Sequence, residues 1–201
     1  GSFLRSLTNV NGTLFFRAND GSNGIDLWKS NGTSSGTVLV KDINVGISSS
    51  TPLSLTHVDG TLFFSANNGT TNGAELWKSD GTSAGTVMVK DINAGILSSS
   101  PSAFTNVYGI LYFRATTTSA GAELWRSDGT EAGTVLVADV LPGPGSSLPT
   151  EMVVRDHFLY FNATGQDLGT ELWAYDLGTP EISIEQPAGT VLVDGASTVS
   201  F

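Results

Sequence analysis

The sequence has no cysteine, few charged residues and fewer cations than anions. Without cysteine there are no disulfides, no thiolate zinc site and no cysteine nucleophile. Charged residues make up 14% of the chain, and 9 Lys and Arg stand against 19 Asp and Glu, which gives a net charge of −10. A surface of this sign repels phosphate backbones, so we expect no nucleic-acid partner. We also expect no membrane span, because no stretch approaches the roughly 18–20 apolar residues that one requires.

Residue types that favour helices are scarce as well. Lys, Arg, Gln and Met are rare, whereas Val, Thr, Phe and Leu fill the apolar runs. The chain has 24 glycines to punctuate these runs, and its hydrophobic share of 39% is enough for a core. Such a composition favours short strands joined by many turns. The sequence therefore predicts an all-β fold.

One phrase recurs along the chain. It reads "GTVLVKDI" at 36–43, "GTVMVKDI" at 85–92 and "GTVLVADV" at 133–140. A tryptophan precedes each copy, and successive tryptophans are 48 or 49 residues apart. The four are Trp28, Trp77, Trp125 and Trp173. Self-similarity at this period indicates a repeat architecture, with four units of about 48 residues over residues 1–178.

Each unit divides into four short strands. The first ends at a pair such as Asn11-Gly12 or Asp59-Gly60, which accepts the positive φ values of a type I′ hairpin. The second reads "TLFFRA", the third "ELWKS" and the fourth "TVLVKDI". Four strands in about 48 residues is the size of a β-propeller blade. We favour a closed four-bladed ring, and the alternative is half of an eight-bladed ring formed by two chains.

The units resemble the bacterial ELWxxDGT repeat family. The resemblance is clearest in "ELWKSDGTSAGTVMVKDI" of the second unit and extends over residues 1–178. It implies propeller-like arrays in secreted or surface proteins and no known catalytic activity. The first copy departs from the pattern at Asp26 and Asn31, and the last departs at Tyr175 and Leu177.

The end of the chain breaks the period. The fourth "GTVLV" begins at Gly189, 16 residues after Trp173, whereas the earlier copies begin 8 residues after their tryptophan. Residues 179–201 resemble the start of a choice-of-anchor immunoglobulin-like domain, and we favour that origin. The alternative is an extra strand of the fourth blade, since an unpaired sheet edge accepts a partner.

Two roles are open for the repeated tryptophans. We expect each indole to pack between neighbouring blades, because a large ring at the same place in every unit fills the same gap. The alternative is a set of stacking platforms for sugars, which would make the protein a lectin with one site per blade.

Carboxylates recur at two fixed positions. We expect the set before each Leu-Trp pair to serve the structure, either by pairing with a Lys or Arg on its own strand or by accepting backbone hydrogen bonds. Repeat symmetry gives these groups like environments, whereas a catalytic acid and base need unlike ones. The other set should cap the turn after the third strand. The two sets are Asp26, Glu75, Glu123 and Glu171, and then Asp80 and Asp128.

The loops between the second and third strands are the candidate binding sites. Their oxygen-bearing residues suit calcium, although the third loop, "TTTSAG", has neither Asp nor Asn. Ca²⁺ is therefore the one cofactor that we consider. We place these loops on one side of the units and the linkers between units on the other. The candidate binding residues are Asp20, Asn23, Asn67, Asn68 and Asn72, and the linkers are 44–52, 93–101 and 141–149.

The pattern as a whole predicts a non-catalytic module. We expect a scaffold or binding surface for a protein or a polysaccharide, outside the cell or at its surface. Neither His57 nor His157 stands in a triad pattern, and no P-loop or HExxH motif is present. A hydrolase that uses carboxylates is the remaining alternative. A homo-oligomer is also open, because half of a ring needs a second chain.

Overall fold

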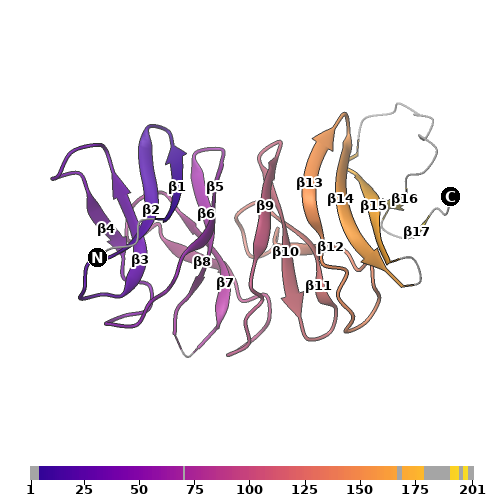
Figure 1. Cartoon of the computed structure of the whole chain (residues 1–201), viewed down its shortest axis with the longest axis horizontal. Helices are drawn as coiled ribbons and strands as arrows, with labels where there is room; N and C mark the ends of the chain where they lie inside the picture. Colours follow the sequence, from indigo (N-terminus) through magenta and orange to yellow (C-terminus); the bar gives the residue numbers. More distant parts are fainter. Residues whose placement is uncertain (1–4, 70, 167–168, 179–190, 195–196, 199–201) are drawn as a thin grey trace.

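The chain forms four sheets that follow one another in sequence order (Figure 1). The computed structural model describes residues 5–69, 71–166, 169–178, 191–194 and 197–198. These residues form strands and turns, and none of them belongs to a helix long and apolar enough to cross a membrane. The predicted all-β class is confirmed.

The strands of each sheet pair in the order in which they occur in the sequence. The first sheet contains β1 (Arg5–Val10), β2 (Thr13–Asn19), β3 (Ile25–Ser30) and β4 (Val38–Lys41). The second contains β5 (Leu53–Val58), β6 (Thr61–Asn67), β7 (Ala74–Ser79) and β8 (Val87–Lys90). The third contains β9 (Ser102–Val107), β10 (Ile110–Thr117), β11 (Gly121–Ser127) and β12 (Val135–Ala138). The fourth contains β13 (Thr150–Arg155), β14 (Phe158–Gly165), β15 (Gly169–Asp176), β16 (Val191–Asp194) and β17 (Ser197–Thr198).

The first hairpins of the first two sheets turn as their sequences predict. Asn11 and Gly12 have φ values of 49° and 85°, and Asp59 and Gly60 have 43° and 81°. Positive φ at both central residues is what a type I′ hairpin requires. This tight turn fixes the register of the first two strands, so that Thr13 faces Val10.

The sheets pack face to face. We call the side of a sheet that is turned toward the preceding sheet its front face, and the side turned toward the next sheet its back face. One hydrophobic cluster joins the first two sheets, and two similar clusters join the second to the third and the third to the fourth. In the first cluster the back face supplies Val10, Phe15, Leu27, Val40 and Ile43, and the front face supplies Leu62, Phe64, Ala66 and Trp77. Because successive side chains of a strand point to opposite faces, the aromatic pairs of the second and third sheets contribute one ring to each of two junctions.

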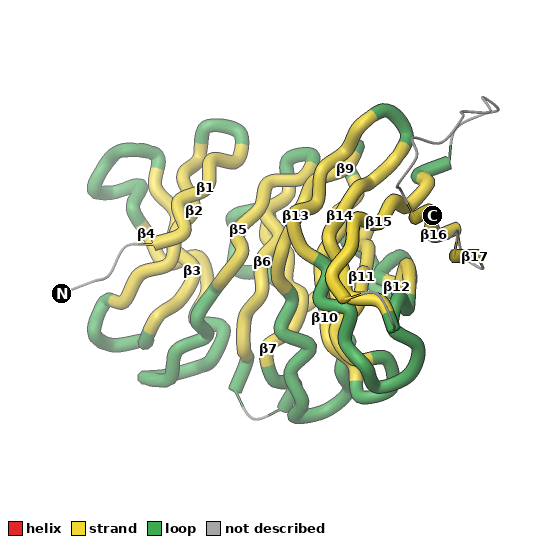
Figure 2. Tube along the Cα trace, turned by 45° about the vertical axis from the view of Figure 1, so that its right-hand side comes forward, coloured by secondary structure: helices red, strands yellow, loops and turns green. Residues whose placement is uncertain are grey.

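The described residues do not form the closed four-bladed ring that we favoured. The four sheets make an open row, with the first and the fourth at its opposite ends in both views (Figures 1 and 2). Contacts between the first strands run from each sheet to the next, from β1 to β5, from β5 to β9 and from β9 to β13. The coarser prediction, a stack of four-stranded antiparallel sheets of propeller type, holds for the first three units.

The fourth sheet differs in its fourth strand. β16 pairs in parallel with β15, with Val191 opposite Trp173, whereas β4, β8 and β12 pair antiparallel with their third strands. The recurring phrase therefore runs in the opposite direction in its last copy. The longer connection after Trp173 allows this change, since a parallel pair needs a connection of about a dozen residues. Residues 179–190 lie outside the described part of the chain, and the immunoglobulin-like origin of the tail stays a prediction.

Candidate functional site

In the first three sheets the repeated carboxylate joins the third strand to the segment that follows the fourth strand. Glu123 accepts hydrogen bonds from the Ser147 amide at 2.8 Å, the Val140 amide at 2.9 Å and the Ser147 hydroxyl at 2.5 Å. Glu75 makes the same three bonds with the corresponding residues of its own linker. Of the two structural roles predicted, these two glutamates take the backbone role, and both are completely buried.

Asp26 occupies this position in the first sheet but is one methylene shorter. Its Oδ1 accepts hydrogen bonds from the Ser50 hydroxyl and from the Ile43 amide, and its Oδ2 has no partner among the described residues. The side chain is nevertheless fully buried. Burial raises the pKa of Asp26 to about 6, against the lowering effect of its hydrogen bonds. Burial raises the pKa of Glu75 and of Glu123 as well.

The free energy of unfolding should fall as the pH rises from about 4.5 to 7.5. The folded state holds the proton of Asp26 more tightly than the unfolded chain, whose ordinary pKa is 3.8. The stability that Asp26 contributes is therefore fully present below pH 3.8 and is lost as the pH rises through 6. The fall attributable to Asp26 over this interval is about 2 kcal/mol.

Urea unfolding of the wild type and of Asp26→Asn at the two pH values checks this prediction. The variant should show a shallower dependence, because the amide does not titrate. Below pH 4 the sign reverses, since hydrogen bonds lower the pKa of the exposed Asp80 and Asp128. A wild type that gains stability between pH 4.5 and 7.5 would contradict the prediction.

Three of the four tryptophans lie inside the junctions between sheets. Trp77, Trp125 and Trp173 are 6%, 8% and 3% exposed. Phe64 stacks on Trp77 with ring centroids 6.5 Å apart. The packing role is confirmed for these three, and their faces are not available to a sugar in every blade. Trp28 differs, because it is only half-buried.

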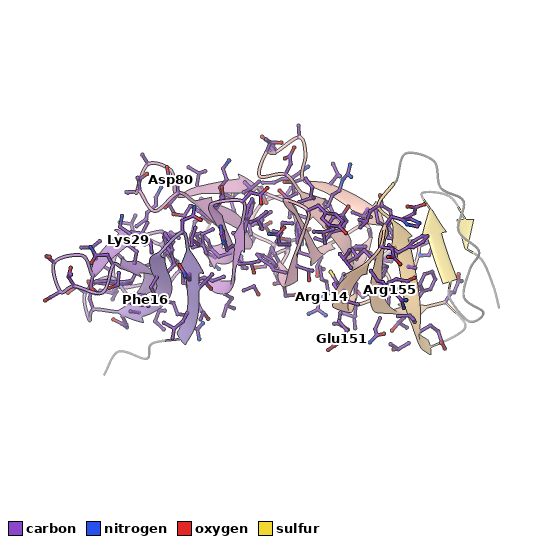
Figure 3. All side chains as sticks on the ribbon, turned by 90° about the horizontal axis from the view of Figure 1, so that it is seen from above. Phe16, Lys29, Asp80, Arg114, Glu151 and Arg155 are labelled. Carbon is purple, nitrogen blue, oxygen red and sulfur yellow. The ribbon has the colours of Figure 1, made fainter. Side chains whose placement is uncertain are left out.

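The acidic turn residues cap the turns after the third strands, as predicted. Asp80 Oδ1 accepts hydrogen bonds from the amide and the hydroxyl of Thr82 at 2.8 and 2.7 Å, and Asp128 binds the corresponding threonine in the same way. The next residue, Gly81, has a φ of 88° and offers its carbonyl to Lys29 Nζ of the preceding sheet at 2.8 Å. Figure 3 labels Lys29 and Asp80 on neighbouring sheets. The turn thus binds one sheet to the next.

A serine pattern that the sequence reasoning overlooked lies in these turns. "GTSSG" at 32–36 and "GTSAG" at 81–85 match the G-x-S-x-G spacing of a nucleophile elbow. An elbow needs a sharp turn from a strand into a helix, whereas these segments connect two antiparallel strands. Ser34 and Ser83 are exposed, and the Ser83 carbonyl accepts a hydrogen bond from Lys41 of the first sheet at 3.3 Å. The pattern here belongs to the turn and to the junction.

The loops between the second and third strands lie at the same end of the sheets as the linkers, so our prediction of opposite sides was wrong. The Ile25 amide donates to the Ser49 hydroxyl of the first linker at 2.9 Å. A Cβ placed on Gly24 would lie 2.6 Å from the Ser48 carbonyl oxygen. In a sheet of four antiparallel strands, the second connection and the exit from the fourth strand leave from one end. We call this end, formed by loops and linkers together, the loop end.

In the first loop, the predicted binding residues hold the loop itself in shape. Asp20 accepts hydrogen bonds from the Ser22 and Asn23 amides, both at 2.8 Å, and from the Asn23 side chain at 2.7 Å. These bonds lower the pKa of Asp20, so the carboxylate is charged at neutral pH. The structure thus brings Asp20 and Asn23 together.

In the second loop, the amide side chains connect the loop to its linker. Asn68 Nδ2 donates to Asn72 Oδ1 at 3.0 Å, and Asn72 Nδ2 donates to Asp91 Oδ2 at 2.8 Å. Asn67 accepts the Gly69 amide at 2.7 Å. Sequence reasoning considered both the asparagines and Asp91 but did not place Asp91 beside Asn72, a contact that the shared loop end explains. Over the described residues no three His, Cys, Asp or Glu side chains gather as metal ligands, and calcium stays a prediction that depends on amide and backbone oxygens.

The third sheet has a hollow of about 570 Å³ at the loop end. Its wall includes Asn93 of the linker, Thr118 of the loop, and the side chains of Trp125 and Leu136. Asn93 Oδ1 accepts the Thr118 amide and hydroxyl, both at 3.2 Å, and so joins the two segments. Exposed hydroxyls and amides beside Leu136, which is 37% exposed, suit a neutral polar ligand.

Comparison with known proteins identifies similar folds but no family. No family model and no curated protein matches the chain. The solved structures that resemble it include one of puromycin hydrolase, with 16% identity, a TM-score of 0.58, and coverage of 92% of this chain and 30% of that one. A serine-to-alanine mutant of puromycin hydrolase complexed with PGG gives 17% identity and a TM-score of 0.59, over 87% of this chain and 27% of that one. The chain thus spans less than a third of these proteins, and the likeness supports a propeller-like fold alone.

Proposed function

We propose that this protein is a non-catalytic repeat module of propeller type, which works outside the cell or at the cell surface as a scaffold or as a binding surface for a protein or polysaccharide. The observation that carries the proposal is that the repeated residues are already engaged in contacts within and between the sheets. In the second sheet Trp77, Glu75 and Asp80 all serve contacts within or between sheets. What remains for a ligand is the loop end, where the units differ.

The proposal takes its ligand class from the loop end of the third sheet. The hollow beside Thr118 is lined in part by the exposed Leu136, and its polar lining residues carry neutral hydroxyls and amides. A neutral polysaccharide matches this rim better than an anionic one, because the chain carries a net charge of −10. The alternative assembly, half of an eight-bladed ring formed by two chains, would need the fourth sheet of one chain to cover the first sheet of the other, and Arg155 and Ala174 of the fourth sheet do not match that role.

Affinity electrophoresis of the full chain in gels that contain neutral glucans tests the binding role. The glucan should retard the migration of the wild type. The double variant Asn93→Ala and Thr118→Ala should bind about tenfold more weakly, which corresponds to a loss of about 1.4 kcal/mol of binding free energy. The matched control, Asn31→Ala together with Thr33→Ala at the opposite end, should bind like the wild type. Equal retardation of both variants, or turnover of peptide or ester substrates by the chain, would contradict the proposal.

A further inference from the structure

No described sheet lies against the front face of the first sheet, where Leu7 is 64% exposed although Phe16 is only 5% exposed. Its apolar residues line a groove of about 430 Å³. Their counterparts in the next three sheets pack against the back face of the preceding sheet. Leu14 is 37% exposed, whereas the equivalent leucines, Leu62, Leu111 and Leu159, are 0% exposed. The residues of this face are Leu7, Leu14, Phe16, Ala18 and Trp28, and Figure 3 labels Phe16.

The turn of the first sheet is uncovered in the same way. Thr37 lines the groove, while its counterpart Thr86 is fully buried. A Cβ on Gly81 would lie 3.1 Å from the Phe15 ring of the preceding sheet, but nothing lies within 4 Å of the same position at Gly32. The groove therefore lies on a front face with the same residue pattern as the front faces of the other three sheets, but no described back face packs against it.

The occupied junctions show what chemistry such a front face accepts. A back face brings an aromatic ring, a leucine and β-branched residues, which fill the space beside the front-face tryptophan. Two lysines extend the contact, because Lys29 Nζ donates to the Gly81 carbonyl and Lys41 Nζ to the Thr86 carbonyl, both at 2.8 Å. Lys78 and Lys90 repeat these bonds at the next junction. On the first sheet the corresponding carbonyls belong to Gly32 and Thr37.

We propose that the front face of the first sheet is a docking site for another blade of this repeat. The back face of that blade carries the same residue types as the back faces of the first two sheets, namely an aromatic ring, leucine, valine, isoleucine and two lysines. The fourth sheet of a second copy does not offer this chemistry. Arg155 stands there where the first sheet has Val10, and Ala174 stands in place of Lys29. The docked blade continues the row by the same geometry that joins the described sheets. This inference does not depend on the loop end binding a glycan.

A fused chain tests the proposal. A copy of residues 5–52 is placed directly before residue 5 of the full chain, with Trp28→Phe in the copy, so that both proteins contain the same four tryptophans. Acrylamide quenching and emission wavelength then report on the original Trp28. We expect its accessible component to be lost and its emission to shift to the blue. The matched control adds Leu27→Asp, Lys29→Ala and Lys41→Ala in the copy, and there Trp28 should be quenched as in the unfused chain.

Three results would overturn the proposal. The first is a Trp28 that is as accessible to acrylamide in the fused chain as in the unfused chain. This result counts whether or not the copy folds, because the proposal requires this face to hold the copy. Protection of Trp28 in the unfused chain on dimerisation, seen by light scattering, would make a second copy the occupant. Protection of Trp28 by soluble glucan oligosaccharides would make the groove a sugar site. Failure of glucan binding at the loop end would contradict the proposed function but leave the fused-chain result unaffected.

Discussion

Replacing Trp77 by alanine should lower the free energy of unfolding by about 3–5 kcal/mol, while the same replacement of Trp28 should cost about 1 kcal/mol or less. The two residues hold the same place in the repeat, and each pairs with a phenylalanine in register. Trp77 is 6% exposed in a cluster that includes Phe15 and Leu27 of the preceding sheet. Trp28 lies in the open groove, so its removal leaves a wider surface depression and creates no internal cavity.

Urea unfolding followed by far-ultraviolet circular dichroism measures both losses without relying on the indole signal. The pair forms its own control, because β3 and β7 are corresponding strands and the residues directly flanking the two tryptophans are identical. In a row of sheets each unit contacts its neighbours, so the loss at Trp77 should appear first as separate unfolding of the first sheet from the rest. Equal destabilisation by the two replacements would show that the front face of the first sheet is packed after all.

The sequence was sufficient for features that depend on neighbours along the chain. Asn11-Gly12 predicted a turn with positive φ at both residues, and alternation in "TLFFRA" placed Phe15 and Phe16 on opposite faces. The repeated tryptophan predicted a junction, and the junction exists at Trp77, Trp125 and Trp173. Each of these is decided within one unit or between two adjacent units.

Features that depend on the sum of many units were not predictable in this way. Ring closure requires a particular rotation from sheet to sheet, and a repeated phrase fixes the contacts of a junction without fixing that angle. The shared loop end was within reach, because strand parity puts the second connection and the linker at one end, and the prediction ignored that parity. Asp91 beside Asn72 and Asn93 beside Thr118 follow directly once the parity is used.

Removing the carboxylate of Glu123 should destabilise the protein by about 3–5 kcal/mol, because two backbone amides and one hydroxyl lose their buried acceptor together. The donors belong to Val140, just before the linker to the fourth sheet, and to Ser147 within that linker. With Glu123→Ala, water cannot easily replace the lost bonds, since Glu123 and Ser147 are both 0% exposed. The isosteric Glu123→Gln should destabilise the protein less, by about 2 kcal/mol, because one oxygen acceptor remains. Some stability is still lost, since the new amide group faces a donor.

Glu171 is the matched control for this prediction. It holds the same position in the fourth sheet but is only half-buried, and among the described residues it accepts no bonds of this kind. Glu171→Ala should therefore change the free energy of unfolding by less than about 1 kcal/mol in the same urea titration. The order Glu123→Ala, Glu123→Gln, Glu171→Ala, from largest to smallest loss, follows from the number of buried donors left without a partner. A reversed order, or equal losses at Glu123 and Glu171, would mean that the recurring acid acts through its charge and not through the linker that it holds.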